Sequence, residues 1–196
     1  MDRWQALEGG PLLIVIGEVL LVVCSLSYLV WWTITFRPSV RTPPPGGGLF
    51  LAGAVLGGLG GLVLLAVGIA ALLPKASLPA LGATIVGGVL VGALLLYVTT
   101  SVAHRPVTTE LPLIVVWATA QLAAGITLWT AGVLRAPAAS AWIVATVIAT
   151  LVGLTCYLMF YRLEPIPAYW IGMVPLAVDG VVAATLAAIV TLTRVP

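Results

Sequence analysis

The sequence predicts an all-α integral membrane protein with six transmembrane helices. Of its 196 residues, 62% are hydrophobic and only 7% are charged, whereas a soluble domain carries roughly a quarter charged residues. So few charges could not solvate the surface of a soluble protein of this length. Six apolar stretches are each long enough to cross a bilayer, which takes about 20 residues. The predicted spans are Pro11–Phe36, Leu49–Leu73, Leu78–Ser101, Leu111–Leu134, Ala139–Tyr161 and Ala168–Leu192.

Short polar connectors set the boundaries of these spans in order along the chain. They read "RPSVRTPPPGGG", "PKAS", "VAHRPVTTE", "RAPA" and "RLEPIP". Each contains a proline, which disfavours the helical conformation of the residue before it, so we expect the helices to end nearby. None of the connectors is long enough to form a soluble domain. We therefore expect residues 1–196 to form a single transmembrane bundle.

Glycines recur at four-residue spacing in the second and third spans. Gly53, Gly57 and Gly61 lie in the second span, and Gly88 and Gly92 lie in the third. Small residues allow helix backbones to approach closely in lipid. We expect these glycines to pack the second span against the third, and a homodimer face is the alternative.

Two stretches share one ending, which suggests an internal repeat. "LVWWTITFRP" at residues 29–38 and "ITLWTAGVLRAP" at residues 126–137 both read Trp-Thr, then Arg, then Pro. If residues 11–100 and 111–192 are two copies of a three-helix unit, the odd number of spans makes them an inverted repeat, as in many transporters. Alternatively, the tryptophans are independent anchors at the membrane interface.

The basic residues give no preferred orientation in the membrane. The predicted topology places four of them on each side, so the positive-inside rule favours neither orientation. One side holds Arg3, Lys75, Arg135 and Arg194, and the other holds Arg37, Arg41, Arg105 and Arg162.

Two acidic residues, Glu18 and Asp179, are the only charged residues inside the predicted spans. A charge at the bilayer centre costs about 2.5–3.5 kcal/mol on insertion scales. Because neither acid has a Lys or Arg within a span, we expect each to be protonated, to face water or to hold a cation. The two carboxyl groups could also bond to each other and share one proton.

Polar and aromatic residues share helix faces with both acids. Ser25 follows Glu18 by seven residues, and Tyr28 lies close to the same stripe. One turn before Asp179, Pro175 lacks an N–H group and deprives the carbonyl of Ile171 of its helical partner. A free carbonyl beside a carboxyl group suits a cation, a proton or a polar solute.

The fourth span places Trp117, Gln121 and Gly125 on one face, while Thr119 points elsewhere. Gln121 and the threonines of the spans are also explained by hydrogen bonds between helices. The predicted transport path consists of Glu18, Asp179, Gln121, Ser25, Tyr28, Trp117 and Pro175.

These features favour a small transporter or channel that is linked to protons or other cations. A membrane subunit or assembly factor of a larger complex, for example a respiratory one, is the first alternative. An intramembrane enzyme that modifies lipids is the second. It would use His104, Arg105 and Glu110 of the third connector on a phosphate headgroup, although a solvated loop explains the same residues.

No cofactor, metal or nucleic acid is expected, and no enzymatic activity is favoured. Cys24 and Cys156 lie in apolar spans and His104 is the single histidine, so no Cys/His cluster is present in the sequence. The expected partners are the lipid bilayer and either further copies of the chain or a larger membrane complex. The expected location is a bacterial or archaeal cytoplasmic membrane.

Overall fold

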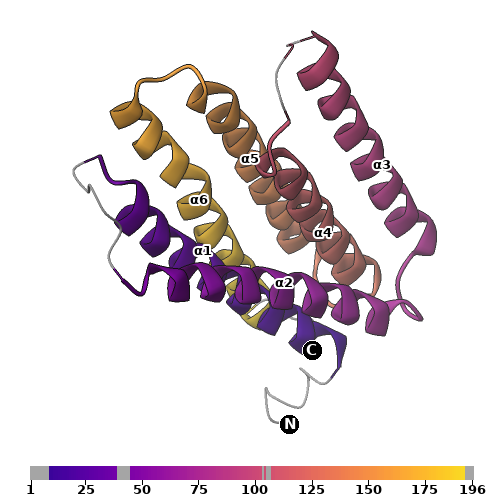
Figure 1. Ribbon diagram of the computed structural model, residues 1–196. Helices are drawn as coiled ribbons and strands as arrows, with labels where there is room; N and C mark the ends of the chain where they lie inside the picture. The colour runs from indigo at the N-terminus through magenta and orange to yellow at the C-terminus, as the bar shows by residue number, and fades with distance from the viewer. Residues whose placement is uncertain (1–8, 39–44, 103, 105–106, 193–196) are drawn as a thin grey trace.

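The computed structural model describes residues 9–38, 45–102, 104 and 107–192. Its helices are α1 (Gly10–Phe36), α2 (Gly47–Leu72), α3 (Leu78–Tyr97), a short π-helix η2 (Val98–Val102), α4 (Glu110–Thr130), α5 (Ala136–Phe160) and α6 (Pro165–Leu192). The structure has six helices that are long and apolar enough to cross a membrane, one in each predicted span. The predicted all-α membrane fold is therefore confirmed (Figure 1).

The helix ends differ from the predicted ones by a few residues, mostly because of proline and glycine. α5 and α6 begin three residues early and place Pro137 and Pro167 in their first turns, where a missing N–H group costs no helical bond. α4 ends at Thr130 because the chain turns at Gly132, whose φ is +76°. The N–H of Leu134 then bonds back to the carbonyl of Leu128, 3.2 Å away.

Five of the helices form a closed ring. α1 packs against α2, α2 against α4, α4 against α5, α5 against α6, and α6 against α1. α3 stands outside this ring and packs against α4 (Figure 1). Leu81 is the one buried residue of α3.

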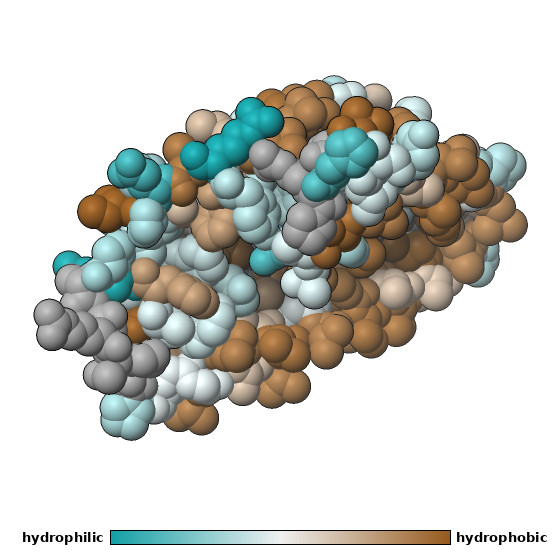
Figure 2. Space-filling model, turned by 45° about the horizontal axis from the view of Figure 1, so that its top comes forward, coloured by the Kyte–Doolittle hydropathy of each residue, from teal (hydrophilic) through white to brown (hydrophobic). Residues whose placement is uncertain are grey.

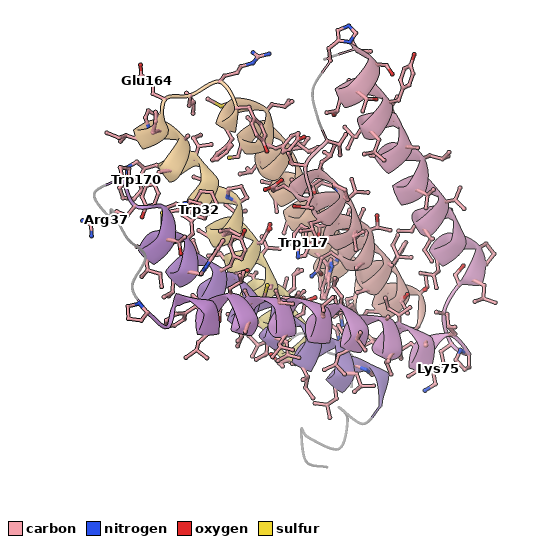
Figure 3. All side chains as sticks on the ribbon, in the orientation of Figure 1. Trp32, Arg37, Lys75, Trp117, Glu164 and Trp170 are labelled. Atoms are coloured by element: carbon pink, nitrogen blue, oxygen red, sulfur yellow. The ribbon has the colours of Figure 1, made fainter. Side chains whose placement is uncertain are left out.

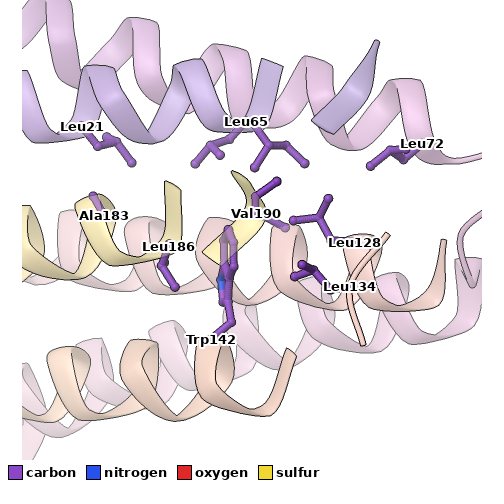
Figure 4. Close-up of a cluster of buried hydrophobic side chains, with 11 residues drawn as sticks. Leu21, Leu65, Leu72, Leu128, Leu134, Trp142, Ala183, Leu186 and Val190 are labelled. Carbon is purple, nitrogen blue, oxygen red and sulfur yellow. The ribbon is translucent and has the colours of Figure 1, made fainter. Parts of the chain in front are cut away.

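The hydrophobic core fills the ring toward the end where α1 begins and α2, α4 and α6 end. In Figure 4, Trp142 reaches from α5 toward the core side chains of α4 and α6. The fully buried members of this core are Ile14, Leu65, Ala124, Leu128, Trp142, Leu186 and Val190.

The glycines pack helices together inside the chain, but the expected pairing of the second span with the third is wrong. The α2 glycines face α1, where a Cβ atom at Gly61 would lie 2.9 Å from the carbonyl oxygen of Gly17. The α3 glycines face α4, where Gly92 meets Val115. Glycine spacing identifies a face that permits close approach, but the complementary small residues of α1 decide which helix occupies it.

The inverted repeat is not confirmed. In such a repeat, helices α1, α2 and α3 would correspond to α4, α5 and α6. The contact of α1 with α2 would then correspond to that of α4 with α5, and the contact of α1 with α6 to that of α4 with α3. All four of these contacts are present. The contact of α5 with α6 would correspond to one of α2 with α3, and the contact of α2 with α4 to one of α5 with α1. α5 packs against α6 and α2 against α4, but the two corresponding pairs are not packed. The two repeated endings differ as well, because Trp32 is half-buried whereas Trp129 is 47% exposed.

The outer surface of the bundle matches a lipid environment. Figure 2 shows hydrophobic residues over the right-hand and lower parts of the visible face, with hydrophilic residues gathered toward its upper left. The charged residues labelled in Figure 3 lie at helix ends, with Lys75 at one end of the bundle and Arg37 and Glu164 at the other. Arg3, Arg41, Arg105 and Arg194 lie outside the described residues.

Candidate functional site

Glu18 is the centre of the candidate site. It is the ninth residue of α1, about 12 Å along the helix from its first residue. Its side chain has an exposed fraction of 0%, and the core residues Ile14 and Leu21 lie one turn before and after it. The carboxyl oxygen Oε2 accepts a hydrogen bond of 3.0 Å from Nε2 of Gln121 on α4.

Trp142 of α5 fixes the position of Gln121. Its indole Nε1–H donates to the backbone carbonyl of Gln121 over 2.8 Å. The absence of a side chain at Gly125 makes room for the indole ring, because a Cβ atom there would lie 2.8 Å from Cδ1 of Trp142. Glu18, Gln121 and Trp142 therefore link α1, α4 and α5 across the ring.

Thr146 lies level with Gln121 on the neighbouring helix. α4 and α5 are antiparallel, with Gly125 opposite Trp142 and Ile114 opposite Gly153. This register places Thr146, one turn after Trp142, opposite Gln121. Thr146 is fully buried, and its hydroxyl has no hydrogen-bond partner among the described residues.

The free hydroxyl of Thr146 is unusual for this protein. Threonines in helices often donate to the carbonyl four residues before them. Among the described residues, nine threonines do so: Thr33, Thr84, Thr100, Thr119, Thr130, Thr150, Thr155, Thr185 and Thr191. Thr146 and Thr127 are fully buried and lack that bond. Thr127 shares a face of α4 with Ala123, four residues before it, and Gln121 lies on a different face of that helix.

The cluster has unused acceptor atoms and no positive charge to balance a carboxylate. Oε1 of Glu18, Oε1 of Gln121 and Oγ1 of Thr146 are buried without a hydrogen-bond partner in the described part of the chain. The ranges of α1 to α6 contain no Lys, Arg or His. An ionised Glu18 would therefore be a buried charge without a basic partner, which is a costly arrangement.

Asp179 forms a separate, half-buried position on α6. Trp32 lies against Gly172 and Ser25 against Gly180, which sets an antiparallel register between α1 and α6. In that register Asp179 is level with the turn of Ser25, roughly 10 Å along α1 from Glu18. The alternative that both acids share one proton is therefore wrong. Within residues 9–192 as described, Asp179 forms no hydrogen bond and no ion pair.

The other predicted path residues divide between the seam of α1 with α6 and the core. Ser25 is buried, and Tyr28 is half-buried and stacks against Trp32 with ring centroids 6.5 Å apart. Trp117 is half-buried and packs against the core, and Figure 3 shows it between α6 and α4. Pro175 lies inside α6, which continues through it without a break.

The role of Trp142 is not apparent from the sequence, because tryptophans of membrane spans are expected as interface anchors. In the structure this tryptophan is fully buried and bonded to Gln121. Its position six residues inside α5 was the only available signal. Glu18 and Gln121 were both predicted as site residues, but nothing in the sequence indicated that they form a pair.

The third connector shows no comparable site. His104 and Glu110 are exposed, and Arg105 lies outside the described residues. Among the residues that the structure describes, no three His, Cys, Asp or Glu side chains are grouped so as to hold a metal ion. Cys24 and Cys156 are free thiols on α1 and α5.

The chemistry available at Glu18 is the binding of a proton or a small hard cation, because the cluster's atoms without a hydrogen-bond partner are all oxygens. Neither described surface hollow contains Glu18 or Asp179. Comparison of the chain with known protein families, curated proteins and solved structures finds no match.

Proposed function

We propose that the protein is a small ion-coupled transporter of a bacterial or archaeal cytoplasmic membrane, in which Glu18 binds the coupling proton or cation. The observation that supports this most strongly is the full burial of Glu18 with one oxygen bonded to Gln121 and the other free. Ionisable residues within membrane spans are costly and commonly mark ion or substrate paths.

Burial also supports a carrier over an open channel. A channel acid faces a water-filled pore, whereas the apolar core encloses Glu18 on α1. Such a carboxyl group exchanges its ion only when the helices around it move apart. In this proposal, Asp179 on the seam of α1 with α6 is a second ion position. It lies farther than Glu18 from the membrane side where α1 begins, and therefore closer to the other side.

Flux measurements in proteoliposomes test this function. Purified protein is reconstituted with an internal pH-sensitive dye, and ion movement is driven by an imposed pH gradient or membrane potential. We expect Glu18→Gln to reduce flux at least tenfold and Asp179→Asn to reduce it less. Glu164→Gln is the matched control, because this exposed loop acid lies outside the site. Equal flux in all four proteins would refute the proposal.

The position of α3 favours a second candidate, a membrane subunit of a larger complex. α3 packs against α4 outside the ring, and an apolar groove of about 630 Å³ lies between α2, α3 and α4. Native mass analysis of the protein released directly from its own membrane distinguishes the two candidates. A stable assembly with other proteins, together with no flux from the isolated chain, supports the subunit function.

A further inference from the structure

We propose that the coupling ion is a proton, held as the neutral carboxylic acid of Glu18 in a two-bond pair with the side-chain amide of Gln121. This inference rests on the proposed function for its biological meaning, but its chemistry can be tested without transport. It also assigns Thr146 as a positioning residue for the same carboxyl group.

The atoms of Glu18 and Gln121 match those of an acid–amide pair. One bond of that pair already exists, from Nε2–H of Gln121 to Oε2 of Glu18 at 3.0 Å. The two atoms that remain unpartnered, Oε1 of Glu18 and Oε1 of Gln121, are both acceptors. A proton on the Glu18 oxygen turns it into a donor to the amide oxygen. One proton therefore satisfies both remaining side-chain oxygens of the pair.

A bound metal cation fits the same atoms less well. Hard cations such as Ca²⁺ and Mg²⁺ take about six or more oxygen ligands. The described cluster offers three unpartnered oxygens, and Oε2 of Glu18 is already an acceptor for an N–H group. A proton requires one donor and one acceptor, which this pair provides in full.

Thr146 explains how the proton could leave. Loss of the proton places a carboxylate oxygen beside the amide oxygen of Gln121, and two acceptors repel each other. The Thr146 hydroxyl lies level with Gln121 on α5 and donates to no backbone carbonyl, so it is a free donor for the ionised form. It would stabilise the anion long enough for the ring of helices to open.

The remaining titratable groups around Glu18 supply no positive charge. α2 contains none. Those of the other four ring helices are Cys24 and Tyr28 on α1, Glu110 on α4, Cys156 and Tyr157 on α5, and Tyr169 and Asp179 on α6. Every one of them is neutral or negative, so none replaces the proton as the partner of an ionised Glu18.

Infrared difference spectroscopy tests the inference on the whole protein in lipid. The carbonyl stretch of a protonated carboxylic acid is resolved from the amide bands, and it shifts in D₂O. An Asp179→Asn background removes the other intramembrane acid. We expect a protonated-acid band at neutral pH that disappears in Glu18→Gln. Gln121→Leu should move it to higher frequency, because both bonds to the acid are lost.

Two further measurements separate a proton site from the alternatives. Addition of Na⁺, K⁺ or Mg²⁺ at constant pH should leave the band unchanged, whereas loss of the band on addition of one of them would overturn the inference. Because Thr146 is proposed to stabilise the ionised form of Glu18, Thr146→Val should keep the protonated-acid band at an alkaline pH at which the Asp179→Asn parent protein has lost it. Absence of the band from the parent protein would also overturn the inference. If the protein shows the expected band but catalyses no ion flux, the proton-binding inference stands and the proposed transport function is refuted.

Discussion

The α1–α2 contact predicts a sharp difference between two glycine-to-alanine substitutions. A Cβ atom at Gly61 of α2 would lie 2.9 Å from the carbonyl oxygen of Gly17 and 2.9 Å from two carbons of Leu21. A Cβ atom at Gly87 of α3 would meet nothing within 4 Å. Both substitutions bring the same gain in helix propensity, at most about 1 kcal/mol, so their difference isolates the cost of the contact.

We expect Gly61→Ala to be about 1–3 kcal/mol less stable than Gly87→Ala, the usual cost of an extra methyl group in a packed interior. The assay is reversible unfolding in mixed micelles with increasing SDS, followed by circular dichroism. Gly87→Ala should be as stable as the native protein or more stable by up to about 1 kcal/mol, because it gains helix propensity and its methyl group meets nothing within 4 Å. Equal stability of the two variants would show that α1 and α2 do not pack through these glycines.

Three further predictions use the same unfolding assay. Trp142→Phe removes the bond to the Gln121 carbonyl, worth about 0.5–1.5 kcal/mol, and part of a fully buried ring, so it should cost more than the bond alone; an unchanged midpoint would contradict both contacts. Gly172→Ala should cost about 1–3 kcal/mol, because its Cβ would lie 2.5 Å from the Trp32 ring, and no loss would contradict the α1–α6 register. Thr127→Val replaces a buried, unpartnered hydroxyl and should be neutral or stabilising by up to about 1 kcal/mol, whereas a clear loss would reveal a missed partner.

The sequence predicts the number and kind of helices well because the cost of exposing polar backbone and charge to lipid acts on each span separately. The distribution of charge between spans and connectors therefore identifies all six helices. The same local information does not specify neighbours. Gly57 and Gly61 mark a face of α2 for close packing, yet only the fold shows that this face meets α1 rather than α3.

The candidate site was predictable to a similar degree. Glu18 and Gln121 are conspicuous as polar residues in apolar spans, and both lie in the buried cluster. Their pairing depends on the spatial order of α1, α4 and α5, which no single span encodes. The role of Trp142 was hidden for the same reason, since its bond partner is a backbone carbonyl on another helix.

The central claim is that Glu18 is retained for ion binding rather than for holding the bundle together. The double substitution Glu18→Leu with Gln121→Leu tests it, with unfolding and proteoliposome flux measured on the same preparation. Buried polar pairs can often be replaced by apolar residues of similar volume without loss of stability. We predict a stability equal to or above that of the native protein and a loss of nearly all flux. A double variant that unfolds about 2 kcal/mol more easily and transports ions as well as the native protein would contradict the claim.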